Sequence, residues 1–206
     1  GGNVSLYNES AGTDIDPTPV IGLLGMVDAL DRRPPGATLI DGHRLVLLGP
    51  DDVSLGGSLW GLAHDAPGGE LAPLDLDLHQ RVADVVRTLV VDGLVDGVHD
   101  VSAGGLGVAV AEMVARSGVG AHLARVPDHR ALFGEGPSRV VLCVDPERLT
   151  EVLSAAQALG VPTTRIGLAT GDRLIVKDLL DVAVHDVCHA HLDRLPEALG
   201  SGTMNR

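Results

Sequence analysis

The chain has 206 residues, enough for one or two domains, and a formal net charge of −13 from 28 acidic and 15 basic residues. No stretch concentrates lysine and arginine, which argues against a nucleic-acid partner, and no apolar run is long enough to span a membrane. Aromatic residues make up only 1%, so the core must be aliphatic, which favours an α/β protein. Cys143 and Cys188 lack zinc-site spacing and indicate free thiols in a reducing cytoplasm.

The first ten residues, GGNVSLYNES, combine close backbone approach with polar side chains. Gly2 has no Cβ, so its backbone can approach a ligand. Asn3 and Ser5 project from the same face of a strand, because side chains alternate along strands. An amide oxygen and a hydroxyl beside backbone N–H groups suit a phosphate-and-magnesium site. A polar turn followed by an edge strand explains the same residues without a ligand.

The segment up to about residue 50 reads as strands joined by turns. The apolar run 20–30 contains two glycines and predicts a bent strand, since glycine weakens a helix. Residues 43–50 predict a short buried strand. The Gly-, Pro- and Asp-rich stretch 51–73 predicts a linker.

Residues 74–95 predict a helix, because apolar residues recur there at helical spacing with charged residues between them. Asp75 or Asp77 can cap its start, and Gly93 can end it.

A glycine-rich loop over 99–105 precedes a second predicted helix over 106–115. Such a loop can bind an anion at the start of the helix, which makes a candidate anion loop of the following residues: Asp100, Ser102, Gly104 and Gly105. The spacing matches neither a Walker A loop nor a dinucleotide fingerprint. The alternative is purely structural: Asp100 or Ser102 caps the helix, and the glycines allow close packing.

The rest of the chain alternates strands and helices. Strands are expected at 119–126, 138–145, 161–169 and 173–178, and helices at 146–160 and towards the end of 182–199. If the strands flanking helix 146–160 pair in parallel, the unit forms a right-handed crossover.

Four polar residues in this part of the chain allow two interpretations. Arg139 is either a phosphate contact or a charged turn residue before a strand. His185 and His189 have the spacing of two metal ligands on a helix, with His191 nearby. No third ligand stands at a persuasive spacing, so an amphipathic, partly exposed helix is favoured.

Three blocks carry a resemblance to a known family. GGNVSLYNES with DPTPVIGLLGMVD (16–28), HDVSAGGLGVAVAEMV (99–114) and LFGEGPSRVVLCV (132–144) together resemble the synthetase (large) subunit of the phosphoribosylformylglycinamidine synthases. The resemblance covers nearly the whole chain. In that family the first block lies inside a much longer protein, so we expect the chain to be its C-terminal portion.

The resemblance implies an aminoimidazole-ribonucleotide-synthetase-like α/β (α+β) fold. Residues 1–60 would be the C-terminal half of a β-rich ATP-binding N-domain, and residues 61–206 a complete α/β C-terminal domain. Gly2 would bind ATP, Asn3 the Mg²⁺ ion and Ser5 the substrate. No catalytic residue is expected within the chain.

The implied reaction converts formylglycinamide ribonucleotide, glutamine-derived ammonia and ATP to formylglycinamidine ribonucleotide, ADP and phosphate. The implied partners are a glutaminase subunit and a small accessory subunit, and the chain alone is expected to be inactive. One alternative is a non-catalytic nucleotide-binding or structural module. Another is a different synthetase of the same superfold, against which the LYNE and PTPVIG residues argue.

Overall fold

The computed structural model describes residues 9–15, 21–26 and 33–200. It divides the chain into two compact units, residues 1–33 and 34–206. Residues 34–60 lie in the second unit because strand β3 (Arg44–Leu48) pairs with two strands from the later part of the chain, β6 (Val140–Val144) and β7 (Thr163–Ala169). The domain boundary at residue 60 stays a prediction.

In the first unit, the described residues form one small hairpin. Strand β1 (Glu9–Ser10) pairs antiparallel with β2 (Thr13–Asp14). The two residues between them, Ala11 and Gly12, have positive φ angles of 52° and 79°, which suit a two-residue hairpin turn.

The predicted strand over 20–30 is wrong over its described part. Ile21–Met26 forms neither helix nor strand. Its large apolar side chains are exposed: Ile21 79%, Leu23 96%, Leu24 99% and Met26 92%. An apolar run becomes a strand only when other strands and an apolar layer cover it, and the described residues supply neither.

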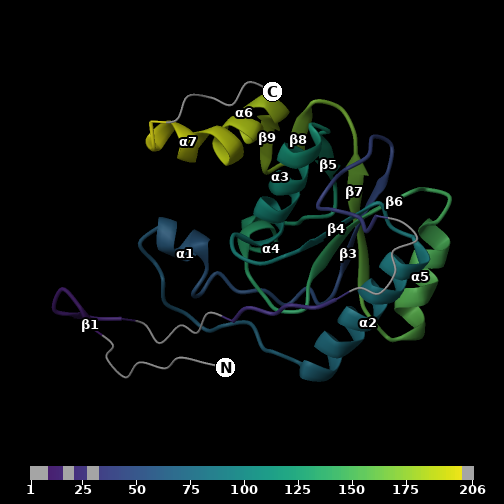
Figure 1. Ribbon diagram of the computed structural model, residues 1–206, viewed down its shortest axis with the longest axis horizontal. Helices are drawn as coiled ribbons and strands as arrows, with labels where there is room; N and C mark the ends of the chain where they lie inside the picture. The colour runs from purple at the N-terminus through teal and green to yellow at the C-terminus, as the bar shows by residue number, and fades with distance from the viewer. Residues whose placement is uncertain (1–8, 16–20, 27–32, 201–206) are drawn as a thin grey trace. The chain divides into compact units, whose positions relative to one another are not determined.

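The second unit is built on a seven-stranded sheet with the order β4-β6-β3-β7-β5-β8-β9. The strands not yet given are β4 (Gly97–Asp100), β5 (Ala121–Leu123), β8 (Arg173–Val176) and β9 (Leu180–Ala183). Neighbouring strands are antiparallel except β5 and β8. The strands predicted at 138–145 and 161–169 do not pair with each other, because β3 lies between them (Figure 1).

The helices of this unit cover both faces of the sheet. They are α1 (Leu59–Ala63), α2 (Leu76–Asp92), α3 (Gly105–Ser117), α4 (His129–Phe133), α5 (Leu149–Ala158), α6 (Val184–Cys188) and α7 (Arg194–Ala198), with a π-helical turn at His189–Asp193. Figure 1 shows α2 and α5 together on one side of the sheet and α3 on the other. The short helix α1 falls in the predicted linker, and α4 falls in a stretch for which the sequence predicted no element.

Alternation along β3 sorts the core into two apolar clusters. Leu45 and Leu47 pack in the cluster that contains α3, α4 and α6. Val46 and Leu48 pack in the cluster that contains α2 and α5. Because successive side chains point to opposite faces of a strand, this central strand supports both layers at once.

The longest predicted helix is confirmed as α2, together with its end signals. The Asp75 carboxylate accepts a hydrogen bond from the Leu78 N–H at 2.9 Å, as an N-cap does. Gly93 ends the helix in the left-handed conformation, with φ 68°. The buried face consists of Val82, Val85 and Leu89.

Both cysteines are free thiols, and Cys143 is completely buried in β6. Burial raises the pKa of the Cys143 thiol to about 11.

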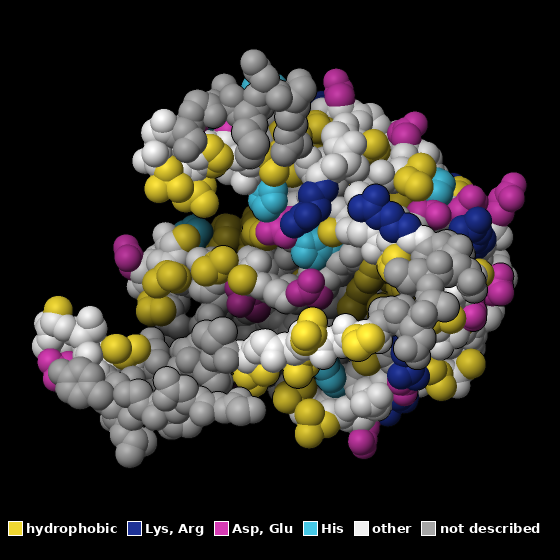
Figure 2. Space-filling view, viewed as in Figure 1, with side chains coloured by type: hydrophobic (Ala, Val, Ile, Leu, Met, Phe, Trp, Pro, Cys, Tyr) yellow, Lys and Arg dark blue, Asp and Glu magenta, His cyan; other side chains and the backbone are white. Residues whose placement is uncertain are grey.

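At the C-terminal end of this unit, Leu195 of α7 and Leu199, which follows the helix, are exposed. Figure 2 shows apolar side chains projecting from the C-terminal helices. No helix in the described part of the chain is long and apolar enough to cross a membrane.

Candidate functional site

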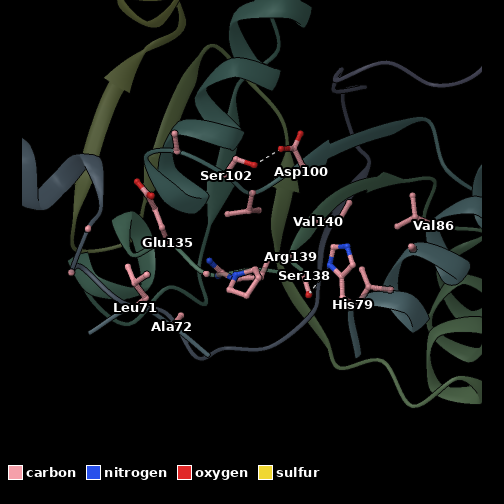
Figure 3. A pocket seen from close by; sticks show the side chains of 18 of the residues that line it. Leu71, Ala72, His79, Val86, Asp100, Ser102, Glu135, Ser138, Arg139 and Val140 are labelled. Atoms are coloured by element: carbon pink, nitrogen blue, oxygen red, sulfur yellow. Dashed lines mark hydrogen bonds between the residues drawn. The ribbon is translucent and has the colours of Figure 1, made fainter. Parts of the chain in front are cut away.

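A cavity of about 910 Å³ lies where β4 and β6 meet the start of α2 and the loop before α1. Its walls are largely apolar, with polar groups at a few positions. The side chains that matter for its chemistry are His79, Asp100, Ser102, Glu135, Ser138 and Arg139 (Figure 3). They come from three segments that are far apart in the sequence, so only the fold brings them together.

The predicted anion loop borders this cavity. Strand β4 ends at Asp100, and α3 begins at Gly105 after the N-cap Gly104, whose φ is 81°. The predicted side-chain cap by Asp100 or Ser102 is wrong, because the N-cap residue is Gly104 and neither of those side chains accepts a hydrogen bond from the start of α3. Instead the Ser102 hydroxyl donates to the Asp100 carboxylate, and this hydrogen bond is the main cause that lowers the pKa of Asp100.

The carboxylate of Glu135 lies at the start of α3. Its Oε1 accepts the Gly104 N–H at 2.8 Å and the Leu59 N–H of α1 at 2.9 Å. The Gly105 N–H donates to the Ser102 carbonyl oxygen at 3.0 Å. Two donors of the predicted loop are therefore bound to acceptors of the protein itself, with Glu135 as the internal anion at this helix start.

Close packing accounts for one of the loop glycines. A Cβ on Gly105 would lie 2.7 Å from the Gly134 carbonyl oxygen, and the φ of Gly105 is 68°. Both observations favour glycine, as the packing interpretation of this loop requires.

Arg139 is buried, with 4% of its surface exposed. Its Nε and Nη1 atoms have no hydrogen-bond partner within the described residues. Burial lowers the pKa of the Arg139 guanidinium, and the charge of Asp51 opposes that change. Arg139 lies directly after a bend and before β6, as the turn interpretation has it, but its side chain is buried instead of exposed to solvent.

His79 and Ser138 form a polar pair on another wall of the cavity. The His79 Nδ1 lies 3.0 Å from the Ser138 hydroxyl oxygen. Ser138 has a φ of 63°, an uncommon conformation for a residue with a side chain. Sequence reasoning missed His79, Glu135 and Ser138. The only signal for the last two was the third resemblance block, which contains both.

The remaining predicted site residues lie elsewhere. Gly2, Asn3 and Ser5 are outside the described residues. The exposed His185 lies 3.4 Å from the Asp186 carboxylate. The His189 Nδ1 lies 3.5 Å from Asp193 and 3.9 Å from Glu197. Within 9–15, 21–26 and 33–200, no three His, Cys, Asp or Glu side chains are grouped to hold a metal ion.

Comparisons with known proteins bear on the whole chain. Residues 41–178 match the family model of the AIR synthase related protein, C-terminal domain. The chain is 38% identical over 203 residues to the phosphoribosylformylglycinamidine synthase subunit PurL of Nocardioides sp. (strain JS614), and 40% identical over 206 residues to that of Methylocella silvestris. Each alignment covers 97% of the chain and 27% or 28% of the relative's length. The predicted resemblance is thereby confirmed.

Solved structures agree on the fold. The Thermotoga maritima PurL complexed with FGAR has a TM-score of 0.63 at 18% identity, over 75% of this chain and 29% of that one. The same protein complexed with ATP has a TM-score of 0.61 at 17% identity, over 75% and 27%. These likenesses confirm the α/β, AIR-synthetase-like fold class that the sequence predicted.

Proposed function

The chain belongs to the AIR-synthase-related family, and from that membership we propose that it is part of the ATP-dependent ligase that makes formylglycinamidine ribonucleotide in purine biosynthesis. The observation that carries the proposal is 38–40% identity to PurL subunits over 97% of the chain. The chain spans little more than a quarter of those subunits, so the activity is proposed for a longer assembly.

The reaction has two steps in this proposal. The amide oxygen of formylglycinamide ribonucleotide attacks the γ-phosphorus of ATP, and ADP leaves. Ammonia then attacks the activated carbon, and phosphate leaves as the amidine forms. Reactions of this kind are accelerated mainly by positioning the reactants and stabilising charge.

Three residues of the first block are proposed to contribute to that site. The Gly2 backbone would bind the nucleotide, the Asn3 amide oxygen would bind Mg²⁺, and the Ser5 hydroxyl would bind the substrate. Magnesium prefers oxygen ligands and would neutralise charge on the phosphates when bound. The T. maritima PurL complexes with ATP and ADP support nucleotide binding by proteins of this fold.

The same proposal includes the implied partners and compartment. A glutaminase subunit would supply ammonia, and a small accessory subunit would complete the assembly. The PurLQS structure from T. maritima, to which this chain is similar, supports such a complex. The two free cysteines are consistent with a reducing cytoplasm.

The exposed apolar run Ile21–Met26 gives a physical reason for expecting a larger assembly. Contiguous exposed apolar side chains are typical of surfaces that bind another protein segment. We infer that this run packs against the rest of an ATP-binding domain of which residues 1–33 supply one part.

The test is a calorimetric titration of the chain and of its Asn3→Ala variant with ADP in the presence of magnesium. We expect Asn3→Ala to weaken binding about tenfold, because one metal ligand is lost. Asn8→Ala, a second asparagine of the same block with no assigned role, is the control. Equal affinity in all three proteins would reject the Asn3 assignment.

A turnover assay separates a synthetase part from a non-catalytic module. The chain alone is expected to show no conversion of formylglycinamide ribonucleotide, and adding the remaining part of a PurL subunit is expected to restore it. Nucleotide binding without any restored turnover would favour the module instead.

A further inference from the structure

The cavity in Figure 3 contains a buried positive charge that has no counter-ion in contact with it. Arg139 is the one charged side chain classed as buried within the described residues. Its Nε and Nη1 have no partner there. Figure 3 shows it near the middle of the cavity lining, with Glu135 on one side and Ser138 and His79 on the other. A buried ion without a partner is costly, so this arrangement favours binding of an anion.

The nearby carboxylates do not serve as that counter-ion. Glu135 accepts hydrogen bonds from the Gly104 and Leu59 N–H groups, and Asp100 accepts one from Ser102. The charge of Asp51 raises the pKa of Arg139 without a hydrogen bond between them among the described residues, and both residues line a smaller cavity of about 200 Å³. No ion pair joins Arg139 to any carboxylate among the residues described.

A second donor faces the same cavity. The Ser138 hydroxyl lies 3.0 Å from the His79 Nδ1. When that hydroxyl donates to Nδ1, the neutral ring carries its proton on Nε2, which is then a free donor. An arginine fork beside an imidazole N–H is suited to the oxygens of a phosphate group.

The cavity is also too large and too apolar for a free phosphate ion alone. Its volume of about 910 Å³ is in the range of small-molecule sites. Apolar side chains form much of the wall: Leu71, Ala72, Val82, Ala83, Val86, Val101 and Val140. Such a wall can cover the organic part of a ligand once its anionic group is fixed.

We propose that this cavity binds a small phosphomonoester, with its phosphate group on Arg139 and His79 and its organic part against the apolar wall. The site uses none of Gly2, Asn3 and Ser5, and it requires no metal ion. The proposal therefore goes beyond the synthetase function and can fail independently of it.

The test is calorimetric titration of the 206-residue chain in magnesium-free buffer with two probes, inorganic phosphate and ribose 5-phosphate. We expect ribose 5-phosphate to bind more tightly, and Arg139→Met to weaken its binding about tenfold or more. Arg87→Met is the matched control, because Arg87 lines the same cavity but is exposed and paired with Asp84 at 2.9 Å. Arg139→Lys should retain part of the affinity.

Two further variants keep the test independent of folding defects. Ala83→Trp introduces bulk at an exposed position of the cavity wall and is expected to weaken ribose 5-phosphate binding without lowering the melting temperature. Asn3→Ala should bind ribose 5-phosphate as the unmodified chain does, even where it loses magnesium–ADP binding. Unliganded Arg139→Met is expected to melt no lower than the unmodified chain, because it removes a buried unpaired charge.

Three results would overturn the proposal: no binding of ribose 5-phosphate at millimolar concentration, binding by Arg139→Met within twofold of the unmodified chain, and equal affinity for inorganic phosphate and ribose 5-phosphate. The second would show that Arg139 has no role in binding the ester, and the third that the apolar wall does not bind its organic part.

Discussion

Two short runs rich in aliphatic residues have opposite environments in this protein. Ile21–Met26 forms no strand and is exposed, whereas Arg44–Leu48 is the central strand β3, with Leu45, Val46 and Leu48 fully buried. The first run contains two glycines, which weaken a strand, and β3 contains none, but their surroundings differ more. β3 has a strand on each side and a helical layer on each face, all supplied by the second unit. Burial therefore depends on partners elsewhere in the chain.

The largest expected contrast is between two leucine truncations. Leu45→Ala should lower the free energy of unfolding by about 2–5 kcal/mol, because it leaves a cavity at a fully buried position. Leu24→Ala, at a position that is 99% exposed, should change it by no more than about 0.5 kcal/mol. Urea unfolding measures both. A large loss for Leu24→Ala would mean that Ile21–Met26 is packed within this chain.

A smaller difference in stability is expected between two glycine-to-alanine substitutions, each of which adds one methyl group. A Cβ on Gly97 in β4 would lie 2.0 Å from the Thr38 carbonyl oxygen, so Gly97→Ala should cost about 1–3 kcal/mol. A Cβ on Gly22 meets nothing within 4 Å, and Gly22→Ala should be neutral within about 0.5 kcal/mol. Thermal melts of the two variants make the comparison. Equal melting temperatures would contradict the close approach at Gly97.

The smallest contrast concerns two glutamates that both accept backbone hydrogen bonds. Glu135→Ala should lower stability by about 1–2 kcal/mol, because the N–H groups of Gly104 and Leu59 lose their acceptor. Glu9 accepts the Gly12 N–H inside an exposed turn, its one hydrogen bond to a backbone N–H outside its own strand pairing among the described residues, and Glu9→Ala should cost at most about 0.5 kcal/mol. Hydrogen exchange at Gly104 is a second readout. Unchanged exchange in Glu135→Ala would show that water replaces the carboxylate.

Much of the secondary structure was predictable from local signals. The helix over 74–95 has an N-cap aspartate, apolar residues at helical spacing and a terminal glycine, and α2 uses all three. The strand over 43–50 was likewise recognisable as a short apolar run bounded by turn residues. Helix α1 was missed because its five residues lie in a stretch rich in Gly, Pro and Asp.

The site was less predictable, because its parts interact over long distances in the sequence. The loop before α3 was found from its glycines, but Glu135, the acceptor for the Gly104 N–H, lies 31 residues from Gly104. The burial of Arg139 follows from its place beside β4, α3 and α4, which no local pattern encodes. Capping by Asp100 or Ser102 was the reasonable local expectation, and the distant carboxylate takes that role instead.

The sequence by itself determined the family, the α/β class, and the helices and strands that carry their own start and stop signals, because those depend on residues close together in the chain. Only the tertiary structure decided the insertion of β3 between β6 and β7, the division of the chain after Arg33, and the buried, unpaired state of Arg139. These features arise from contacts between distant segments, whose stability depends on which surfaces the whole fold brings together.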